Sequence, residues 1–212
     1  MALRAHQPSA VILGVSLLGL TLASCGSSGV STTPEEPSET RATLNKLVDH
    51  NLVLLATTRT STMQREMQEV ADAGYSLAGL QGGRTGGGFW ELVVVMQRNP
   101  ESTPRTEYRL LATVKTSTME EELQRAGNAG FFYRAQTSLD KQTVVILERN
   151  RDLESIQRIE YKLLATTKTS TMQQELLAAT AAGFNFAGVT VAEHLFGGKE
   201  VVTILSRPVT GN

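Results

Sequence analysis

The alternation of apolar and polar residues follows one pattern three times along the chain. Each copy has a short apolar run, then apolar residues at helical spacing, then two further apolar runs that suit strands. The most similar stretches begin at Leu54, Leu110 and Leu163, and the first and third agree at about 11 of 14 positions. This agreement indicates internal duplication, and each copy predicts the order strand, helix, strand, strand.

The strands are expected at equivalent places in the three copies. Short apolar runs predict first strands at residues 52–57, 108–113 and 161–166. Alternating apolar positions predict third strands at residues 91–97, 142–148 and 200–206, each followed by an arginine at Arg98, Arg149 or Arg207.

The helices have a start and a stop signal in every copy. Ser61, Ser117 and Ser170 each stand three residues before a Gln or Glu, which is the pattern of a capping box. Helices are therefore expected to begin near residues 62, 118 and 171. Each helix pattern ends at a glycine that is followed by an aromatic residue, and glycine suits the left-handed position after a helix.

These elements predict an α+β fold of three tandem βαββ repeats packed into one domain. A single repeat of this size buries too little apolar surface to be stable alone, so the repeats are expected to share sheet faces. A pseudo-threefold axis is one arrangement that would allow this. The expected divisions are a signal peptide at 1–24, a lipidated end and flexible tether at 25–45, and repeats at 46–100, 101–150 and 151–212.

The third repeat resembles a small bacterial domain of unknown function. Its residues 161–208 carry a Tyr-Lys start, a Gly-Phe pair after the helix, and a final strand that ends in Arg207-Pro208. Asn99 and Asn150 stand where the proline would be in the other two repeats. The resemblance implies no known activity.

The first residues predict export and a lipid anchor. Arg4 precedes an apolar run of about 13 residues, which suits a signal peptide and is shorter than the ~20 residues of a membrane-spanning helix. The run ends in Leu22-Ala23-Ser24-Cys25, which resembles the lipobox of bacterial lipoproteins. That resemblance implies lipidation of Cys25 and attachment to a membrane, the outer membrane facing the periplasm if the cell is diderm, because residue 26 is not Asp.

Composition narrows the choice of partners. Cys25 is the only cysteine, so an internal disulfide is excluded. The chain has 20 Lys and Arg against 21 Asp and Glu and no basic stripe, so nucleic acid is not an expected partner. The expected partners are the membrane, through the anchor, and an envelope protein or the cell wall.

No catalytic constellation, metal site or cofactor site is expected. The repeated serines have no recurring histidine beside them and are explained by helix capping. The histidines and aspartates match no metal-ligand spacing. Recurrent acidic residues with the recurrent arginines could instead form three equivalent polar sites, and these residues are Glu66, Glu122 and Glu175 with Arg98, Arg149 and Arg207.

The loops between the second and third strands differ most among the repeats. Residues 79–88 are rich in glycine but lack the ending of a phosphate-binding loop, so they are interpreted as a mobile hairpin loop. Aromatic and polar residues in and beside two of these loops are candidates for partner binding, although hairpin packing would also explain the aromatics. The candidates are Gly82, Gly83, Arg84, Phe89, Trp90, His194 and Phe196.

The sequence thus favours a non-enzymatic envelope lipoprotein that acts as a binding or assembly module. Two alternatives remain open at this stage. One is an envelope hydrolase that acts on glycans through the recurrent Glu and Arg residues, and the other is a lipoprotein that binds a small ligand.

Overall fold

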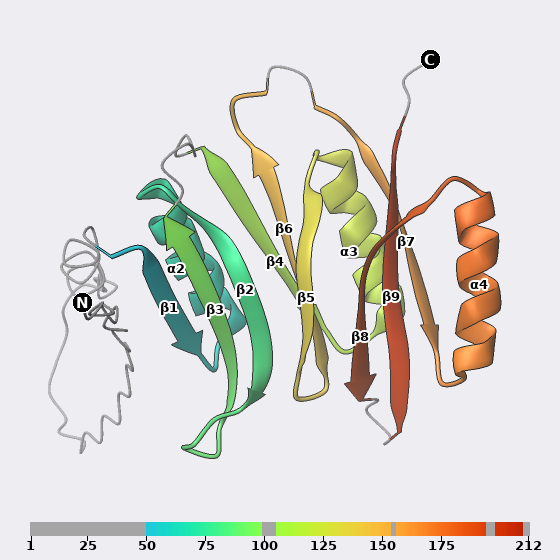
Figure 1. Cartoon of the computed structure of the whole chain (residues 1–212), viewed down its shortest axis with the longest axis horizontal. Coiled ribbons are helices and arrows are strands. Elements are labelled where there is room, and N and C mark those ends of the chain that lie inside the picture. Colours follow the sequence, from blue (N-terminus) through green and yellow to red (C-terminus); the bar gives the residue numbers. More distant parts are fainter. Residues whose placement is uncertain (1–49, 99–104, 154–155, 194–197, 210–212) are drawn as a thin grey trace, which may run out of the picture.

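The structure is a computed structural model, and it describes residues 50–98, 105–153, 156–193 and 198–209. These residues form three successive units with the same order of elements (Figure 1). Unit 1 comprises β1 (Leu52–Thr57), α2 (Thr60–Asp72), β2 (Tyr75–Arg84) and β3 (Trp90–Arg98). Unit 2 comprises β4 (Thr106–Thr113), α3 (Thr116–Asn128), β5 (Phe132–Leu139) and β6 (Gln142–Asn150). Unit 3 comprises β7 (Ile159–Thr166), α4 (Thr169–Ala181), β8 (Asn185–Glu193) and β9 (Lys199–Pro208).

Each unit is a three-stranded antiparallel sheet with one helix. The last strand of the unit lies in the middle of its sheet, and the strand orders are β1-β3-β2, β4-β6-β5 and β7-β9-β8. The second strand of every unit has a register shift at the same place, between Leu77 and Gly79 in unit 1. The predicted α+β class and the βαββ order are confirmed for the described residues.

The predicted helix starts are wrong by about two residues. The helices begin at Thr60, Thr116 and Thr169, and their N-cap residues are Arg59, Lys115 and Lys168, none of which makes a side-chain cap bond. The serines therefore lie inside the first turn and do not cap it. A threonine at the end of the preceding strand organises the turn instead: in unit 1, the Thr57 hydroxyl accepts a hydrogen bond from the Arg59 amide at 3.2 Å.

The predicted helix ends are confirmed. Gly74, Gly130 and Gly183 follow the C-caps with φ angles of +89°, +79° and +84°. This region of backbone space suits glycine, because a Cβ atom would be strained there. The chain then turns directly into the second strand of each unit.

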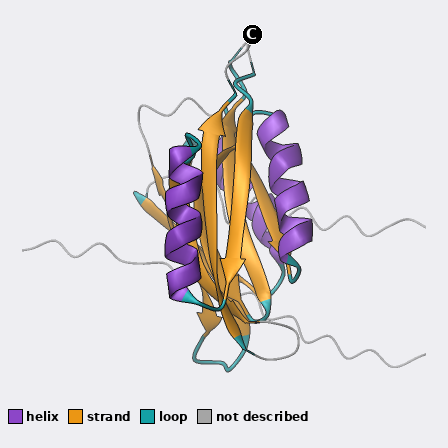
Figure 2. Ribbon diagram, turned by 90° about the vertical axis from the view of Figure 1, so that its right-hand side faces the viewer, coloured by secondary structure: helices purple, strands orange, loops and turns teal. Residues whose placement is uncertain are grey.

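The three units lie side by side in a row, with unit 2 in the middle (Figure 1). Viewed along the row, the sheets overlap and the helices lie beside them (Figure 2). We call the sheet face that carries the unit's own helix the inner face and the opposite face the outer face. In unit 1 the inner face includes Val94 and Met96, which are buried, and the outer face includes Val93 and Val95, which are half-buried.

The main apolar cores lie between neighbouring units. The inner face of unit 1 and its helix pack against the outer face of unit 2, where Tyr108, Val144 and Ile146 are buried in the same cluster. The inner face of unit 2 packs in the same way against Ile159, Tyr161 and Ile204 of unit 3. Because each face pairs with the next unit and not with a common centre, the pseudo-threefold arrangement considered from sequence is wrong.

Each contact between units uses equivalent elements. Helix α2 lies against β4 and strand β2 against β5, and likewise α3 lies against β7 and β5 against β8. Glutamines on α2 cover the free edge of β4: the amides of Tyr108 and Leu110 donate to the side-chain oxygens of Gln68 and Gln64 at 3.0 and 2.9 Å. The Gln68 side chain also donates to the carbonyl of Thr106 at 3.0 Å. These bonds satisfy backbone groups that an edge strand otherwise leaves unpaired.

Candidate functional site

The hairpin between β2 and β3 contains five of the residues singled out from sequence. Gly82, Gly83 and Arg84 lie within β2, Phe89 lies in the turn, and Trp90 begins β3. The prediction of a loop over residues 79–88 is therefore wrong for its first six residues, which pair with β3 through to Arg84 and Trp90.

Gly82 lies at the contact between units 1 and 2. Its amide donates to the Thr137 hydroxyl at 2.9 Å, and a Cβ atom at this position would lie 2.1 Å from the carbonyl oxygen of Ser138. Glycine is needed here because the backbones of β2 and β5 approach each other closely. Gly83 has open space around it. Gly82 therefore positions the hairpin and does not belong to an exposed loop.

The turn of this hairpin presents aromatic side chains to solvent. The Thr85 amide donates to the carbonyl of Phe89 at 3.2 Å, and the Gly88 amide donates to the carbonyl of Thr85 at 2.8 Å, so the turn closes on itself. Phe89 is 67% exposed and Trp90 is 36% exposed. The Arg84 guanidinium lies 5.4 Å from the centre of the Trp90 ring. We call Arg84, Phe89 and Trp90 the hairpin tip.

The remaining residues proposed from sequence lie outside the described residues. His194 and Phe196 belong to the segment between β8 and β9, and Cys25 belongs to residues 1–49. The turns after β2 and after β5 both lie along the lower side of the row in Figure 1. In unit 2 this turn is tight, with Asp140 at a φ of +51°. The hairpin tip is thus the larger projection of the two.

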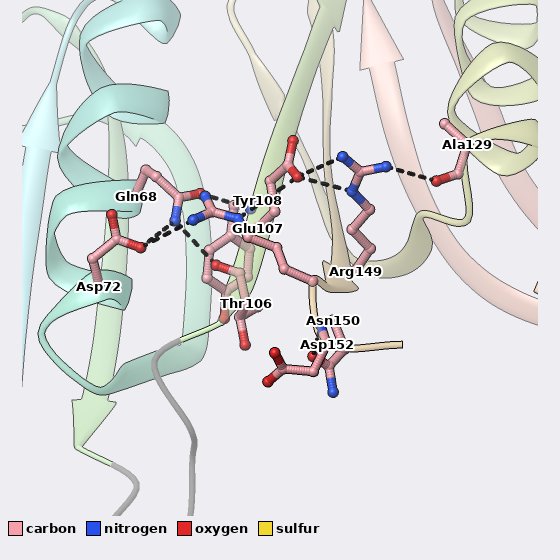
Figure 3. Close-up of polar contacts among 10 residues, drawn as sticks. Gln68, Asp72, Thr106, Glu107, Tyr108, Ala129, Arg149, Asn150 and Asp152 are labelled. Carbon is pink, nitrogen blue, oxygen red and sulfur yellow. Dashed lines mark hydrogen bonds and ion pairs between the residues drawn. The ribbon is translucent and has the colours of Figure 1, made fainter. Parts of the chain in front are cut away.

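In units 2 and 3 the recurrent arginine contacts residues of its own unit. In unit 2, Arg149 contacts the carboxylate of Glu107 at 2.7 and 2.8 Å and donates to the carbonyl of Ala129 at 3.1 Å (Figure 3). In unit 3, Arg207 makes the equivalent contacts with Glu160 and Ala182, at 2.7 and 2.6 Å. Each of these two arginines therefore links the first strand of its unit to the C-terminal end of the helix, where backbone carbonyls lack helical partners.

Unit 1 departs from this arrangement. Asn51 stands at the position of Glu107 and Glu160, and the Arg98 guanidinium lies 5.4 Å from the centre of the Tyr75 ring. The contacts of the described residues do not join the arginines to Glu66, Glu122 or Glu175. The three equivalent Glu–Arg sites considered from sequence are therefore not formed. Burial raises the pKa of Glu66, and Arg65 opposes this effect.

A polar groove of about 760 Å³ lies between α2 and β4. Its charged side chains are largely paired. The Gln68 side chain donates to the Asp72 carboxylate at 2.9 Å (Figure 3). The Arg151 guanidinium lies 3.6 Å from the Asp72 carboxylate and 3.7 Å from the Glu107 carboxylate. The groove follows the helix surface from its first turn to its last. Its lining residues of charged type are Arg65, Glu69, Asp72, Glu107, Glu122 and Arg151.

A hydrogen-bond network that the sequence did not reveal links units 1 and 2. The amide of Leu77 donates to the Tyr108 hydroxyl at 2.9 Å, and this hydroxyl is hydrogen-bonded to the Glu148 carboxylate. The Arg134 guanidinium lies 3.0 Å from the same carboxylate. Burial raises the pKa of Glu148, whereas Arg134 and Tyr108 lower it. Burial likewise raises the pKa of Tyr108 to about 12.

The described residues contain no helix that is long and apolar enough to cross a membrane, and no group of His, Cys, Asp or Glu side chains placed to hold a metal ion. Comparison of the chain with models of protein families, with curated proteins and with solved structures finds no match.

Proposed function

We propose that this chain is a cell-envelope lipoprotein that works as a non-enzymatic binding or assembly module. In this proposal Cys25 carries the lipid, the segment 25–45 tethers the folded units to the membrane, and the hairpin tip contacts the partner. In a diderm cell the membrane would be the outer one, with the units facing the periplasm.

The exposed aromatic tip is the observation that carries this proposal. Tryptophan and arginine are enriched among the residues that dominate binding energy, and an exposed phenylalanine beside them adds apolar area to bury. The tip is also held on a closed turn between two paired strands, so ordering it on binding costs little entropy. Such a tip suits a partner protein with an apolar pocket, or a sugar ring of the cell wall.

The proposal can be tested by crosslinking the full chain in its own cells and identifying the crosslinked species by mass spectrometry. Phe89→Ser should abolish the crosslink to the partner without changing the expression level, because it removes the exposed phenyl ring of the hairpin tip. Leu153→Ser is the matched control, since Leu153 is 56% exposed on a different loop. A partner that survives Phe89→Ser, or a loss that is equal in both variants, would contradict the proposed role of the tip.

The anchor has its own test. Cys25→Ala should move the chain from the membrane fraction to the soluble fraction, because a lipidated cysteine is the feature that would hold it there. A variant that stays in the membrane fraction would contradict lipidation and leave the test of the hairpin tip unaffected.

The polar groove favours a second candidate function, the binding of a small polar ligand between units 1 and 2. Its volume of about 760 Å³ is within the range of ligand sites, and its lining offers both carboxylates and guanidinium groups. Thermal-shift screening of cell-wall fragments would test this function. Stabilisation that is lost in Glu122→Gln would support it, since Glu122 lines the groove. The same screen with hydrolysis assays would address the glycan hydrolase considered from sequence.

A further inference from the structure

We propose that copies of this chain associate head to tail, with unit 3 of one copy packing on unit 1 of the next. The contact would repeat the arrangement that joins units 1 and 2 and units 2 and 3 inside the chain. It involves a surface other than the hairpin tip, so it stands or falls independently of the function proposed above.

The leading surface of the row is the inner side of unit 3, which comprises α4 and β8. In units 1 and 2 the equivalent surface is covered by the next unit, and Leu77 of β2 is only 8% exposed there. In unit 3 no further unit follows in the described chain, and the equivalent position, Phe186, is 59% exposed. Leu177 of α4 is 61% exposed, and Val189 and Val191 of β8 are exposed to a similar degree.

The composition of this surface differs from that of a capped end. Terminal units of repeat proteins normally have a polar outer face that keeps the array soluble. Here the change runs in the opposite direction, because Leu177 stands where α2 and α3 carry Gln68 and Gln124. The end of the row is therefore more apolar on this helix than the surfaces that are already buried between units.

The trailing surface of the row is the outer side of unit 1, formed by β1 and β3. In units 2 and 3 this side receives the preceding unit, and Tyr108 and Tyr161 there are 2% and 5% exposed. In unit 1 the equivalent residue is Leu52, which is 55% exposed. The rest of the face is also apolar, with Val93 and Val95 of β3 only half-buried.

The two ends complement each other at equivalent positions. Inside the chain, Gln68 of α2 accepts a hydrogen bond from the backbone of Tyr108, and Gln124 of α3 accepts one from Tyr161 at 3.4 Å. The corresponding contact between copies would place Leu177 beside Leu52. Leu177 lacks the side-chain acceptor of Gln68 and Gln124 and adds apolar area beside the exposed Leu52. Gln173 stands at the position of Gln64, whose side-chain oxygen accepts a hydrogen bond from the Leu110 amide inside the chain.

A contact of this type joins two different surfaces, so each copy keeps one free surface of each kind. Such heterologous contacts extend into rows or close into rings. The occupant of both surfaces is therefore a second copy of this chain. If the chain is anchored through Cys25, confinement to a membrane would raise the local concentration and favour the contact.

Thiol crosslinking distinguishes this contact from other modes of association. The full chain carrying both Leu52→Cys and Leu177→Cys, treated with a short bismaleimide, should give a ladder of dimers, trimers and larger species. Either substitution alone should give no more dimer than the unmodified chain, because the two thiols lie on different surfaces. The unmodified chain shows what Cys25 contributes. An intrachain crosslink between Gln68→Cys and Thr106→Cys, which lie in contact across units 1 and 2, confirms that the reagent can span from a helix to the first strand of the following unit.

Dimers from a single substitution would show that a surface pairs with itself and would overturn the proposal. A double variant without a ladder would overturn it as well. Sedimentation velocity of the unmodified full chain provides a measurement that needs no cysteine variant. The sedimentation coefficient should rise with protein concentration, and Leu177→Glu should abolish the rise, whereas Leu153→Glu should leave it unchanged. A single monomeric species at all concentrations would exclude the head-to-tail contact.

Discussion

Replacement of Gly82 by alanine should destabilise the fold much more than replacement of its neighbour Gly83. At Gly82 a Cβ atom would lie 2.1 Å from the carbonyl oxygen of Ser138 and 3.3 Å from Cγ2 of Thr137. Because the near atom belongs to the backbone of β5, the two strands must separate by about 1 Å to restore ordinary contact. At Gly83 the added methyl group would meet no atom within 4 Å.

The expected magnitude follows from the contacts that the separation disturbs. Overpacking of a well-packed site typically costs about 1–3 kcal/mol. The hydrogen bond from the Gly82 amide to Thr137 would be weakened too, which adds roughly 1 kcal/mol. The total is about 2–4 kcal/mol, or roughly a 5–15 °C lower melting temperature for a chain of this size. Gly83→Ala should be neutral or stabilising by a few tenths to about 1 kcal/mol, because alanine restricts the unfolded chain.

Thermal unfolding of both variants should be followed by circular dichroism and by the fluorescence of Trp90, the single tryptophan of the chain. Trp90 pairs with Arg84 in the same hairpin, so its signal reports on unit 1. If Gly82→Ala melts within about 1 °C of Gly83→Ala, the close approach of β2 and β5 does not stabilise the contact between units, and the reasoning is refuted.

Two further predictions concern the same contact. Gln68→Ala should lower the free energy of unfolding by about 1–3 kcal/mol, because it removes two hydrogen bonds to β4. Gln124→Ala should lower it less, because it removes one longer hydrogen bond to β7. Urea unfolding measures both free energies, and equal losses would argue against the role of Gln68. Burial raises the pKa of Glu148 in the folded state above its ordinary value of 4.5. Between the ordinary and the raised pKa the native state binds more protons than the unfolded state, so stability should increase as the pH falls through that window. Glu148→Gln should lack this increase; a constant difference between the variant and the unmodified chain from pH 7 to pH 4.5 would show that Glu148 does not titrate in this way.

Local structure was predictable from sequence because it depends on local signals. The order of strands and helices follows from the spacing of the apolar residues, which changes between every second residue in the strands and helical spacing in the helices. That change is present in each copy. The positions after the helices follow from the requirement for a left-handed backbone, which selects Gly74, Gly130 and Gly183. Neither signal requires knowledge of which units meet in space.

The errors concern residues whose role is set by a neighbouring unit. Gln64 fits a capping box in sequence, yet its side-chain oxygen accepts a hydrogen bond from Leu110 of unit 2. Gly82 fits a turn in sequence, because glycine-rich segments usually mark turns, yet it lies in a strand that touches β5. In both cases a contact between units replaces the local role that the residue type suggests.

The hairpin tip was only partly predictable. The aromatic pair Phe89-Trp90 was visible beside the glycine-rich segment, but its exposure depends on where the turn begins, and the turn begins after Arg84. The network of Tyr108, Glu148 and Arg134 left no sequence signal, because its members come from three strands and meet only when the sheet of unit 2 forms. Packing of unit 1 then adds the Leu77 amide. Long-range polar contacts of this kind have no fixed spacing along the chain.

The way in which neighbouring units meet explains why each end of the row keeps an uncovered surface among the described residues. A sheet edge exposes unpaired amides and carbonyls, and inside the chain this problem is solved by glutamines of the preceding helix, as Gln68 does for β4. A unit in this arrangement protects the edge of its successor and not its own. The first edge strand, β1, therefore has no helix of a preceding unit against it in the described chain, and α4 has no following edge to cover. Duplication of such a unit lengthens the row without removing either end, so the same surfaces that built the chain remain available to join one chain to another.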